Sequence, residues 1–310
     1  MNIIDSLTAG FQALFRRMWL AAVPIVLDLA IWLGPKISAA PLIKAGFNQL
    51  EQIIPNNPAI AVVGSEEMLR VALSEAQAML ESINLASLLA VGQLWLPNIA
   101  GVLPVTGDEA SILYLSTVVQ FLAIVAILMG ISLLIGVIFL ALLGQTAKDE
   151  GVNVAGAIKQ SLRQWLNLAA IYVPLGLMAF SIINFSLILG PFAYFILVFM
   201  LWVALYLTFI PQAVVLSHAS PIEALRTSFV LVRLNFWSTL GLLLLTSLIR
   251  FGFGYIFGRL LSSTTGIVAA IVLNALLGTG LALAFCYFYN DRLSRYHQLL
   301  AKLRANKQHD

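Results

Sequence analysis

The sequence predicts an all-α, polytopic membrane protein with six transmembrane helices, arranged as three hairpins, and with interfacial amphipathic helices. Hydrophobic residues make up 61% of the chain and charged residues only 10%, whereas about a quarter of the residues in a soluble domain are charged. Several apolar runs are long enough to cross a hydrocarbon core of about 30 Å. Basic residues gather in every second connection between these runs, as the orientation rule for membrane proteins requires.

Residues 1–34 are predicted to form an interfacial helix and the first transmembrane helix. The first half places apolar residues on one helical stripe and ends with two arginines, and the second half is a short apolar run with Asp28 near its middle. A signal peptide is the competing interpretation, because the arginines precede an apolar run and Ser-Ala-Ala at 38–40 resembles a cleavage site. Asp28 and the long amphipathic leader argue against cleavage.

Residues 35–111 are predicted to form an extracytoplasmic helical cap. Hydropathy falls here, and no stretch is both long and uncharged. Residues 65–89 have acidic residues in their first turn and apolar residues on one face, which indicates a helix, and a shorter amphipathic helix should end near residue 54. Seven acidic residues outnumber three basic residues in the segment, so the cap should be acidic.

Four further parts follow the cap. Residues 112–144 contain the second transmembrane helix, and residues 145–216 contain an interfacial helix followed by the third and fourth transmembrane helices. Residues 217–289 contain an interfacial helix followed by the fifth and sixth transmembrane helices. Residues 290–310 form a basic cytoplasmic tail. The second transmembrane helix is predicted most clearly, because residues 115–143 contain no charged residue. Gly190-Pro191 leaves room only for a tight turn between the third and fourth transmembrane helices, and the tail has the pattern of a basic surface helix.

The junction that enters the fifth transmembrane helix has the clearest local signals. Ser220 and Glu223 fit a capping box, and Pro221 occupies the first helical position. Arg226 and Arg233 lie one heptad apart on the polar side of the expected helix. Its expected apolar face consists of Ile222, Leu225, Phe229 and Val232. We therefore expect a cytoplasmic interfacial helix over residues 221–233, with Glu223, Arg226 and Arg233 exposed.

The basic residues predict the orientation of the chain. With the amino terminus inside, all but five of the 17 basic residues fall in cytoplasmic segments. The exceptions are Lys36, Lys44, Arg70, Arg250 and Arg259. Both termini should therefore be cytoplasmic.

Three junctions share one pattern of small or capping residues, an amphipathic basic stretch, a tryptophan and an apolar run. They begin near residues 2, 153 and 219, and each introduces one hairpin in the same orientation. Such copies would be parallel repeats, related by an axis near the membrane normal. The alternative is convergence of unrelated segments on one generic interfacial solution.

The stretch SPIEALRTSFVLVRLNFWSTLGLLLL resembles the cytoplasmic helix and following transmembrane helix of a broad group of prokaryotic six-span membrane proteins. The group includes the membrane domain of some glycerophosphoryl diester phosphodiesterases and the YciC-like inner-membrane proteins. The resemblance is clearest over residues 145–290, and it implies the prokaryotic cytoplasmic (inner) membrane. It extends to no catalytic domain, so it implies no catalytic residue.

Two charged residues lie inside predicted transmembrane helices, where an unpaired ion costs a few kcal/mol. Counted from the cytoplasmic side, Asp28 and Arg250 differ in depth by about 5 Å, which an arginine side chain can cover. We therefore predict an intramembrane ion pair that ties the first hairpin to the third. A substrate-facing or proton-linked site and independent snorkelling are the alternatives.

Glycine spacing predicts close helix packing. Gly254 and Gly258 form a GxxxG pattern, and Gly278 and Gly280 have the same expected role. Three prolines should kink or end their helices: Pro24, Pro174 and Pro211.

The ingredients of an enzyme are missing from the sequence. It has no carboxylate pair, no metal-type histidine spacing, no phosphate loop and no nucleophile elbow. A single cysteine excludes a cysteine-ligated metal site, and the three histidines have the setting of ordinary surface residues. We therefore expect no enzymatic activity, no cofactor and no metal. Nucleic acid is not an expected partner, because no dense basic face is present.

Three functions remain open. The leading one is a lipid-associated accessory factor, with anionic headgroups at its cytoplasmic face. The second is a transport permease that couples to a cytoplasmic ATPase through residues 221–233, although the glycine expected after the Glu-Ala pair in such coupling loops is absent. The third is a subunit that fills space in a larger membrane-protein complex.

Overall fold

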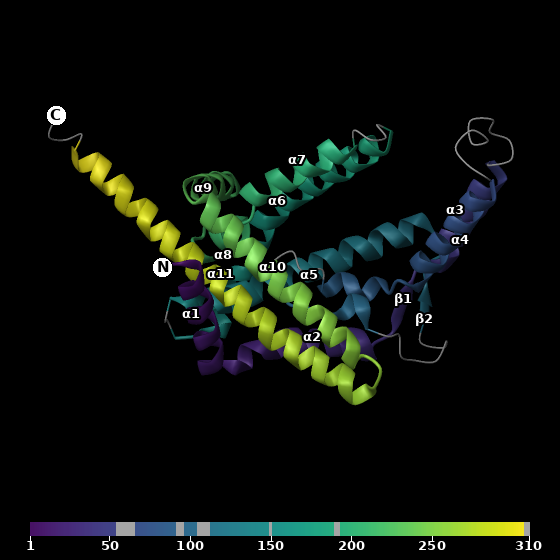
Figure 1. The fold of residues 1–310 in the computed structure, drawn as a ribbon, viewed down its shortest axis with the longest axis horizontal. Coiled ribbons are helices and arrows are strands. Elements are labelled where there is room, and N and C mark those ends of the chain that lie inside the picture. Colours follow the sequence, from purple (N-terminus) through teal and green to yellow (C-terminus); the bar gives the residue numbers. More distant parts are fainter. Residues whose placement is uncertain (54–65, 91–95, 104–111, 149–150, 189–192, 307–310) are drawn as a thin grey trace. The chain divides into compact units, whose positions relative to one another are not determined.

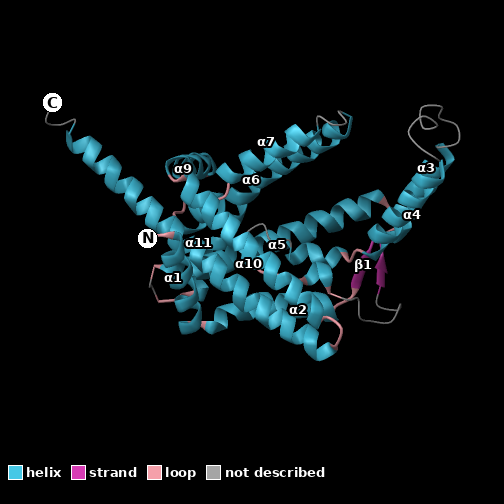
Figure 2. Cartoon of the chain, in the orientation of Figure 1, coloured by secondary structure: helices cyan, strands magenta, loops and turns pink. Residues whose placement is uncertain are grey.

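The computed structural model describes residues 1–53, 66–90, 96–103, 112–148, 151–188 and 193–306. Helices dominate this part of the chain, and Figure 2 shows one small pair of strands beside them. The chain forms two compact units. Unit 1 comprises Met1–Pro24, Gly92–Pro97 and Leu133–Asp310, and unit 2 comprises Ile25–Val91 and Asn98–Ser132. The turn expected at Gly190-Pro191 lies outside the described residues.

Unit 2 contains a two-stranded parallel sheet that the all-α prediction missed. Strand β1 (Lys36–Ser38) pairs with β2 (Ile112–Tyr114). The Leu115 amide extends the pairing and donates to the Ser38 carbonyl at 2.9 Å. These strands lie at the two ends of the predicted cap segment, so the sheet joins the ends of that segment. Strands of three residues are too short to show the alternation by which a strand is recognised.

Two helices and two 3₁₀ turns of unit 2 lie between these strands in sequence. Helix α3 (Ala40–Ile53) packs against α4 (Glu66–Ser82), and the 3₁₀ turns η3 (Leu85–Ala90) and η4 (Ala100–Val102) follow. A core cluster forms beneath them from Ala39, Leu85, Leu115 and Leu128.

The predicted helix over residues 65–89 is too long. It ends at Ser82, because Asn84 takes the chain out of the helix. The Asn84 side-chain oxygen accepts the Ile37 and Ala86 amides, both at 3.0 Å. One asparagine thus caps η3 and holds it against β1, which is a use of the side chain that competes with helix continuation.

Five helical stretches are long and apolar enough to cross a membrane. They are Val118–Ala147, Val154–Phe185, Ala193–Leu216, Phe236–Leu260 and Thr264–Leu303. The predicted first transmembrane helix is a shorter apolar stretch, Met18–Leu33, made of η1 (Met18–Ala21) and α2 (Ala22–Leu33). At the usual rises per residue it measures about 26 Å, slightly less than a hydrocarbon core.

Apolar side chains cover the outside of several of these helices. Helices α6 (Val154–Ile188) and α7 (Ala193–Tyr206) lie side by side (Figure 1), yet α7 buries none of its residues. In each of the stretches Val154–Phe185 and Ala193–Leu216, only 11% of the most apolar 18-residue segment is buried. Continuous apolar surface of this extent needs an apolar solvent. The chain is therefore a helical, polytopic membrane protein.

Helix α11 (Thr264–Asn306) is the centre of unit 1. It packs against α1 (Ile3–Arg16), η1, α9 (Pro221–Leu234) and α10 (Phe236–Leu260). The predicted surface helix of the tail is not a separate element, because one helix of 43 residues covers both the last transmembrane stretch and the tail. No glycine or proline lies between residues 281 and 306, so nothing in that stretch ends the helix.

Helix α1 lies directly against α11, with glycine at the crossing. A Cβ atom on Gly10 would lie 2.6 Å from the Ala284 nitrogen and the Gly280 oxygen, and one on Gly280 would lie 2.5 Å from the Phe11 ring. Gly278 is equally close to Pro97. Close helix packing is therefore confirmed for Gly280, whereas Gly278 packs against Pro97, which lies outside the helices.

The GxxxG pair on α10 has a different setting. A Cβ atom on Gly254 or Gly258 would meet no described atom within 4 Å. These glycines do not permit a close approach within the described part of this chain. Their role in helix packing stays a prediction, and it would require a second chain.

The fourth transmembrane stretch is broken. Helix α7 ends at Tyr206, and the buried helix α8 (Ile210–Leu216) begins after a turn. Pro211, which was expected to kink or end a helix, lies instead in the first turn of α8. The break leaves backbone groups unsatisfied, and Ser228 of α9 satisfies two of them. Its hydroxyl donates to the Tyr206 carbonyl at 2.7 Å and accepts the Phe209 amide at 3.1 Å.

Helix α9 begins where the sequence predicted, with its capping box and Pro221 in place. The Ser220 amide donates to Glu223 Oε2 at 3.4 Å. The helix buries Ala224, Ser228, Leu231 and Val232 within the protein. Of the predicted apolar face, Val232 is therefore buried, whereas Ile222 and Phe229 are exposed.

Candidate functional site

Two adjoining cavities lie among α5 (Val118–Ala147), α6 and α8 in unit 1. We call them the α5–α6–α8 cavities. The smaller has a volume of about 170 Å³ and the larger about 510 Å³. They share three lining residues, Gln160, Gln164 and His218. The smaller cavity adds Lys148 to these, and the larger adds Lys159, Arg163 and Asn167.

The first turns of α6 supply most of this lining. Lys159 and Arg163 are four residues apart, as are Gln160 and Gln164, so each pair shares a helix face. Asn153 starts the helix, because its side-chain oxygen accepts the Gly156 amide at 2.8 Å. Its backbone amide donates to Gln145 Oε1 at 2.7 Å, which joins the start of α6 to the end of α5.

Side chains from α5 and α6 hold the end of α8 between them. Lys148 Nζ donates to the Leu216 carbonyl at 3.0 Å, and Gln164 Nε2 donates to the Val215 carbonyl at 3.2 Å. These carbonyls are among the last of α8 and have no partner within the helix. The bonds therefore position the cavity lining and satisfy the helix end together.

His218 turns the chain from α8 toward α9 in a left-handed conformation, with φ of 54°. This conformation is unusual for a residue other than glycine, although histidine adopts it more readily than most. Gln164 Nε2 lies 3.1 Å from His218 Nδ1. An amide nitrogen only donates, so Nδ1 accepts and the ring proton is on Nε2. His218 thus lines both cavities and is exposed, as predicted for a surface residue.

The charge in the α5–α6–α8 cavities has one sign. Lys148, Lys159 and Arg163 line them, and no acidic residue of the described part does. Neither Lys159 nor Arg163 forms an ion pair with a described residue. Gln164 is only 5% exposed, and its Oε1 atom has no hydrogen-bond partner among the described residues. The cavities therefore offer cations and one buried acceptor.

A third cavity of about 280 Å³ has the same character. Arg16 and Arg17 line it at the end of α1, together with Thr146 of α5 and Tyr287 of α11. Arg17 Nη1 donates to Thr146 Oγ1 at 3.2 Å. This bond holds Arg17 beside the end of α5, and Arg16 lines the same cavity.

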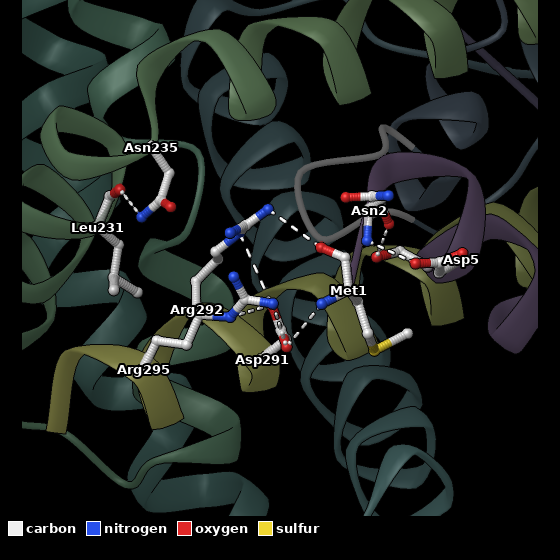
Figure 3. Close-up of polar contacts among 9 residues, drawn as sticks. Met1, Asn2, Asp5, Leu231, Asn235, Asp291, Arg292 and Arg295 are labelled. Atoms are coloured by element: carbon white, nitrogen blue, oxygen red, sulfur yellow. Dashed lines mark hydrogen bonds and ion pairs between the residues drawn. The ribbon is translucent and has the colours of Figure 1, made fainter. Parts of the chain in front are cut away.

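A separate charged cluster fastens α1 to α11 (Figure 3). The Met1 amino group and Arg295 Nε each lie 3.1 Å from a carboxylate oxygen of Asp291. Arg292 Nη2 donates to the Met1 carbonyl at 3.3 Å. The positive groups of this cluster are paired with the Asp291 carboxylate. The cluster therefore stabilises the contact between α1 and α11 and is not an open anion site.

The predicted ion pair has one buried and one exposed member. Asp28 is fully buried in unit 2, where its Oδ2 atom accepts the Ile99 amide at 3.2 Å. Arg250 is exposed on α10 of unit 1. The pairing of these two residues stays a prediction. The Ile99 contact was not foreseeable, because a backbone donor leaves no sign in the sequence.

We expect Asp28→Asn and Arg250→Leu to be coupled in thermal unfolding of the full chain. If they pair, each single change should lower the free energy of unfolding and the double change should cost little more, with a coupling energy of about 1–2 kcal/mol. Arg259→Leu, another cation of α10, should be additive with Asp28→Asn. Additivity of the Asp28 and Arg250 changes would exclude the pair.

The remaining predicted residues lie on the surface of α9. Glu223, Arg226 and Arg233 are exposed, as expected, and none of them lines the three cavities. Among the residues that the structure describes, no group of three or more His, Cys, Asp and Glu side chains could hold a metal ion.

No protein-family model, no curated protein and no solved structure matches the chain.

Proposed function

We propose that this chain is a non-enzymatic, lipid-associated membrane protein of a prokaryotic cytoplasmic membrane. It has six transmembrane helices, five of full length and the shorter Met18–Leu33, and both termini are cytoplasmic. The observation that carries the proposal is the lining of the three cavities. It includes five cations, Arg16, Arg17, Lys148, Lys159 and Arg163, and no acidic residue among those described.

The predicted orientation of the chain places the five cations on the side of the membrane where anionic lipids are found. The five cations belong to the connections that the charge bias assigns to the cytoplasm. The cytoplasmic leaflet carries anionic lipids, which attract each nearby lysine or arginine by about 1 kcal/mol. Five cations at helix ends therefore supply up to about 5 kcal/mol of attraction, enough to enrich anionic lipid strongly around the protein.

We expect tryptophan fluorescence to report this enrichment. Trp19 and Trp165 follow the cavity cations in sequence and are not buried. In nanodiscs at low salt, brominated phosphatidylglycerol should quench the fluorescence more than the same fraction of brominated phosphatidylcholine. The difference should shrink in high salt, because ions screen the attraction. Equal quenching by both lipids at low salt would contradict the proposal.

The permease is the second candidate, and the exposed polar residues of α9 favour it. Glu223 and Arg226 lie on the surface, outside the three cavities, where a soluble partner could bind. Changing both to alanine separates the two functions. A permease should lose a co-purifying ATPase, whereas a lipid-associated protein should keep its subunit composition and its preference for anionic lipid at the cavities.

A further inference from the structure

We propose that the α5–α6–α8 cavities form a specific site for one phosphate ester that carries a hydroxyl group, supplied by the headgroup of an anionic phospholipid. This inference rests on the proposed function and names the ligand class and the residues. The chemical group that such a ligand must present is glycerol phosphate. A lipid and a soluble glycerol phosphate both present it, so the test below separates them.

The phosphate would bind to the unpaired cations. Lys159 and Arg163 are one turn apart on α6, with no described ion-pair partner. Arginine presents a planar fork of donors that fits phosphate oxygens, and lysine adds a compact charge. Lys148 lines the adjoining smaller cavity, and its bond to Leu216 fixes its position. Three cations of known placement thus face two connected spaces.

The hydroxyl group would bind to Gln164. This side chain lines both cavities, and its Nε2 atom is occupied by Val215 and His218. Its Oε1 atom is a buried acceptor with no described partner, and a buried polar atom left in that state costs about 1–3 kcal/mol. No described cation donates to this oxygen, and a ligand hydroxyl can supply the missing donor. The site therefore favours a headgroup with a hydroxyl donor.

The surface beside the cavities suits an acyl chain. Ile158, Leu162 and Leu166 are all exposed, and they follow the same four-residue spacing as Lys159 and Arg163. The apolar stripe is therefore rotated from the polar one by about 100° around α6. A phospholipid could place its headgroup on the polar stripe and a chain on the apolar stripe, whereas a soluble phosphate would use only the polar stripe. This adjacency favours the lipid as the source.

The first test compares two charge-matched double variants of the full chain. The site variant is Lys159→Gln with Arg163→Gln, and the control is Lys44→Gln with Arg259→Gln, whose residues line none of the cavities. Native mass spectrometry during titration with phosphatidylglycerol gives the dissociation constant for the first bound lipid. We expect about fivefold weakening per cation, hence about 25-fold for the site variant, and an unchanged value for the control.

The second test addresses the hydroxyl and the source. Phosphatidylmethanol has the charge of phosphatidylglycerol but no hydroxyl, so wild type should prefer phosphatidylglycerol about fivefold, the value of one hydrogen bond. Gln164→Met should abolish this preference for phosphatidylglycerol over phosphatidylmethanol. Soluble glycerol phosphate and inorganic phosphate are added as competitors, and neither should displace the lipid.

The outcomes separate this inference from the proposed function. Equal weakening by the site and control variants, with anionic lipid still enriched around the protein, would overturn the site alone. The same holds for an unchanged lipid preference in Gln164→Met. Displacement of the lipid by glycerol phosphate would overturn the lipid as the source. Wild type without any preference for anionic lipid would overturn the proposed function as well.

Discussion

Gly10→Val is expected to destabilise the protein by about 3 kcal/mol, the upper end of the usual cost of overpacking. The first atom of any side chain at this position would lie 2.6 Å from backbone atoms of Ala284 and Gly280. Backbone atoms cannot rotate away as a side chain can, so α1 must move off α11. That movement would also expose the buried face of α1, namely Ser6, Gly10, Ala13 and Leu14.

Gly176→Val is the matched control for this prediction. Gly176 also lies inside a helix, α6, but a Cβ atom there meets no described atom within 4 Å. Valine should therefore be neutral or slightly stabilising at this position, since glycine is the poorer helix former. Thermal unfolding of both variants in the same detergent measures the difference. Equal stability of the two variants would show that α1 does not pack closely on α11.

Ser228→Ala is expected to cost about 2–4 kcal/mol. The hydroxyl of Ser228 satisfies the Tyr206 carbonyl and the Phe209 amide at the break between α7 and α8. Ser228 is fully buried, so both backbone groups would lose their partner where water is scarce. Each buried group left in that state costs about 1–3 kcal/mol.

Ser181→Ala provides the comparison for Ser228. The Ser181 hydroxyl donates to the Leu177 carbonyl of its own helix at 2.9 Å and is exposed. Its removal leaves no buried backbone group without a partner, so stability should change by less than about 0.5 kcal/mol. Denaturant unfolding of the two variants decides the matter. A loss at Ser228 no greater than at Ser181 would mean that the break is stable without the hydroxyl.

The features that sequence reasoning predicted well are those with local signals. Long, predominantly apolar runs predicted α5, α10 and the membrane part of α11, because length and apolarity alone decide whether a helix can span. The start of α9 was predicted to the residue, since a capping box and a proline at the first helical position act on neighbouring residues.

Other features depended on contacts distant in sequence. The pairing of β1 with β2 joins residues about 75 positions apart, and the break between α7 and α8 is stabilised by Ser228 of a later helix. The long α11 was missed for another reason. Charged residues after position 290 were interpreted as a change of element, but charge alone does not end a helix when no breaker is present.

The candidate site was foreseeable only in its charge. The cations at 148, 159 and 163 were assigned together to cytoplasmic segments, but the cavities exist because the ends of α5, α6 and α8 meet. Gln164 was not identified as a site residue, because a glutamine on an amphipathic stretch has the pattern of a solvated face. His218 was one of three scattered histidines, and its role depends on a backbone conformation that the sequence does not display.

Native mass spectrometry of the full chain, released gently from its own membrane, tests the central claim most directly. The account predicts the mass of the polypeptide with retained anionic phospholipid and no second polypeptide. Lipid loss on Lys159→Gln with Arg163→Gln would connect the retained molecule to the cavities. A stoichiometric second polypeptide, or a chain that retains only neutral lipid, would contradict the claim and would make the exposed face of α9 the next surface to study.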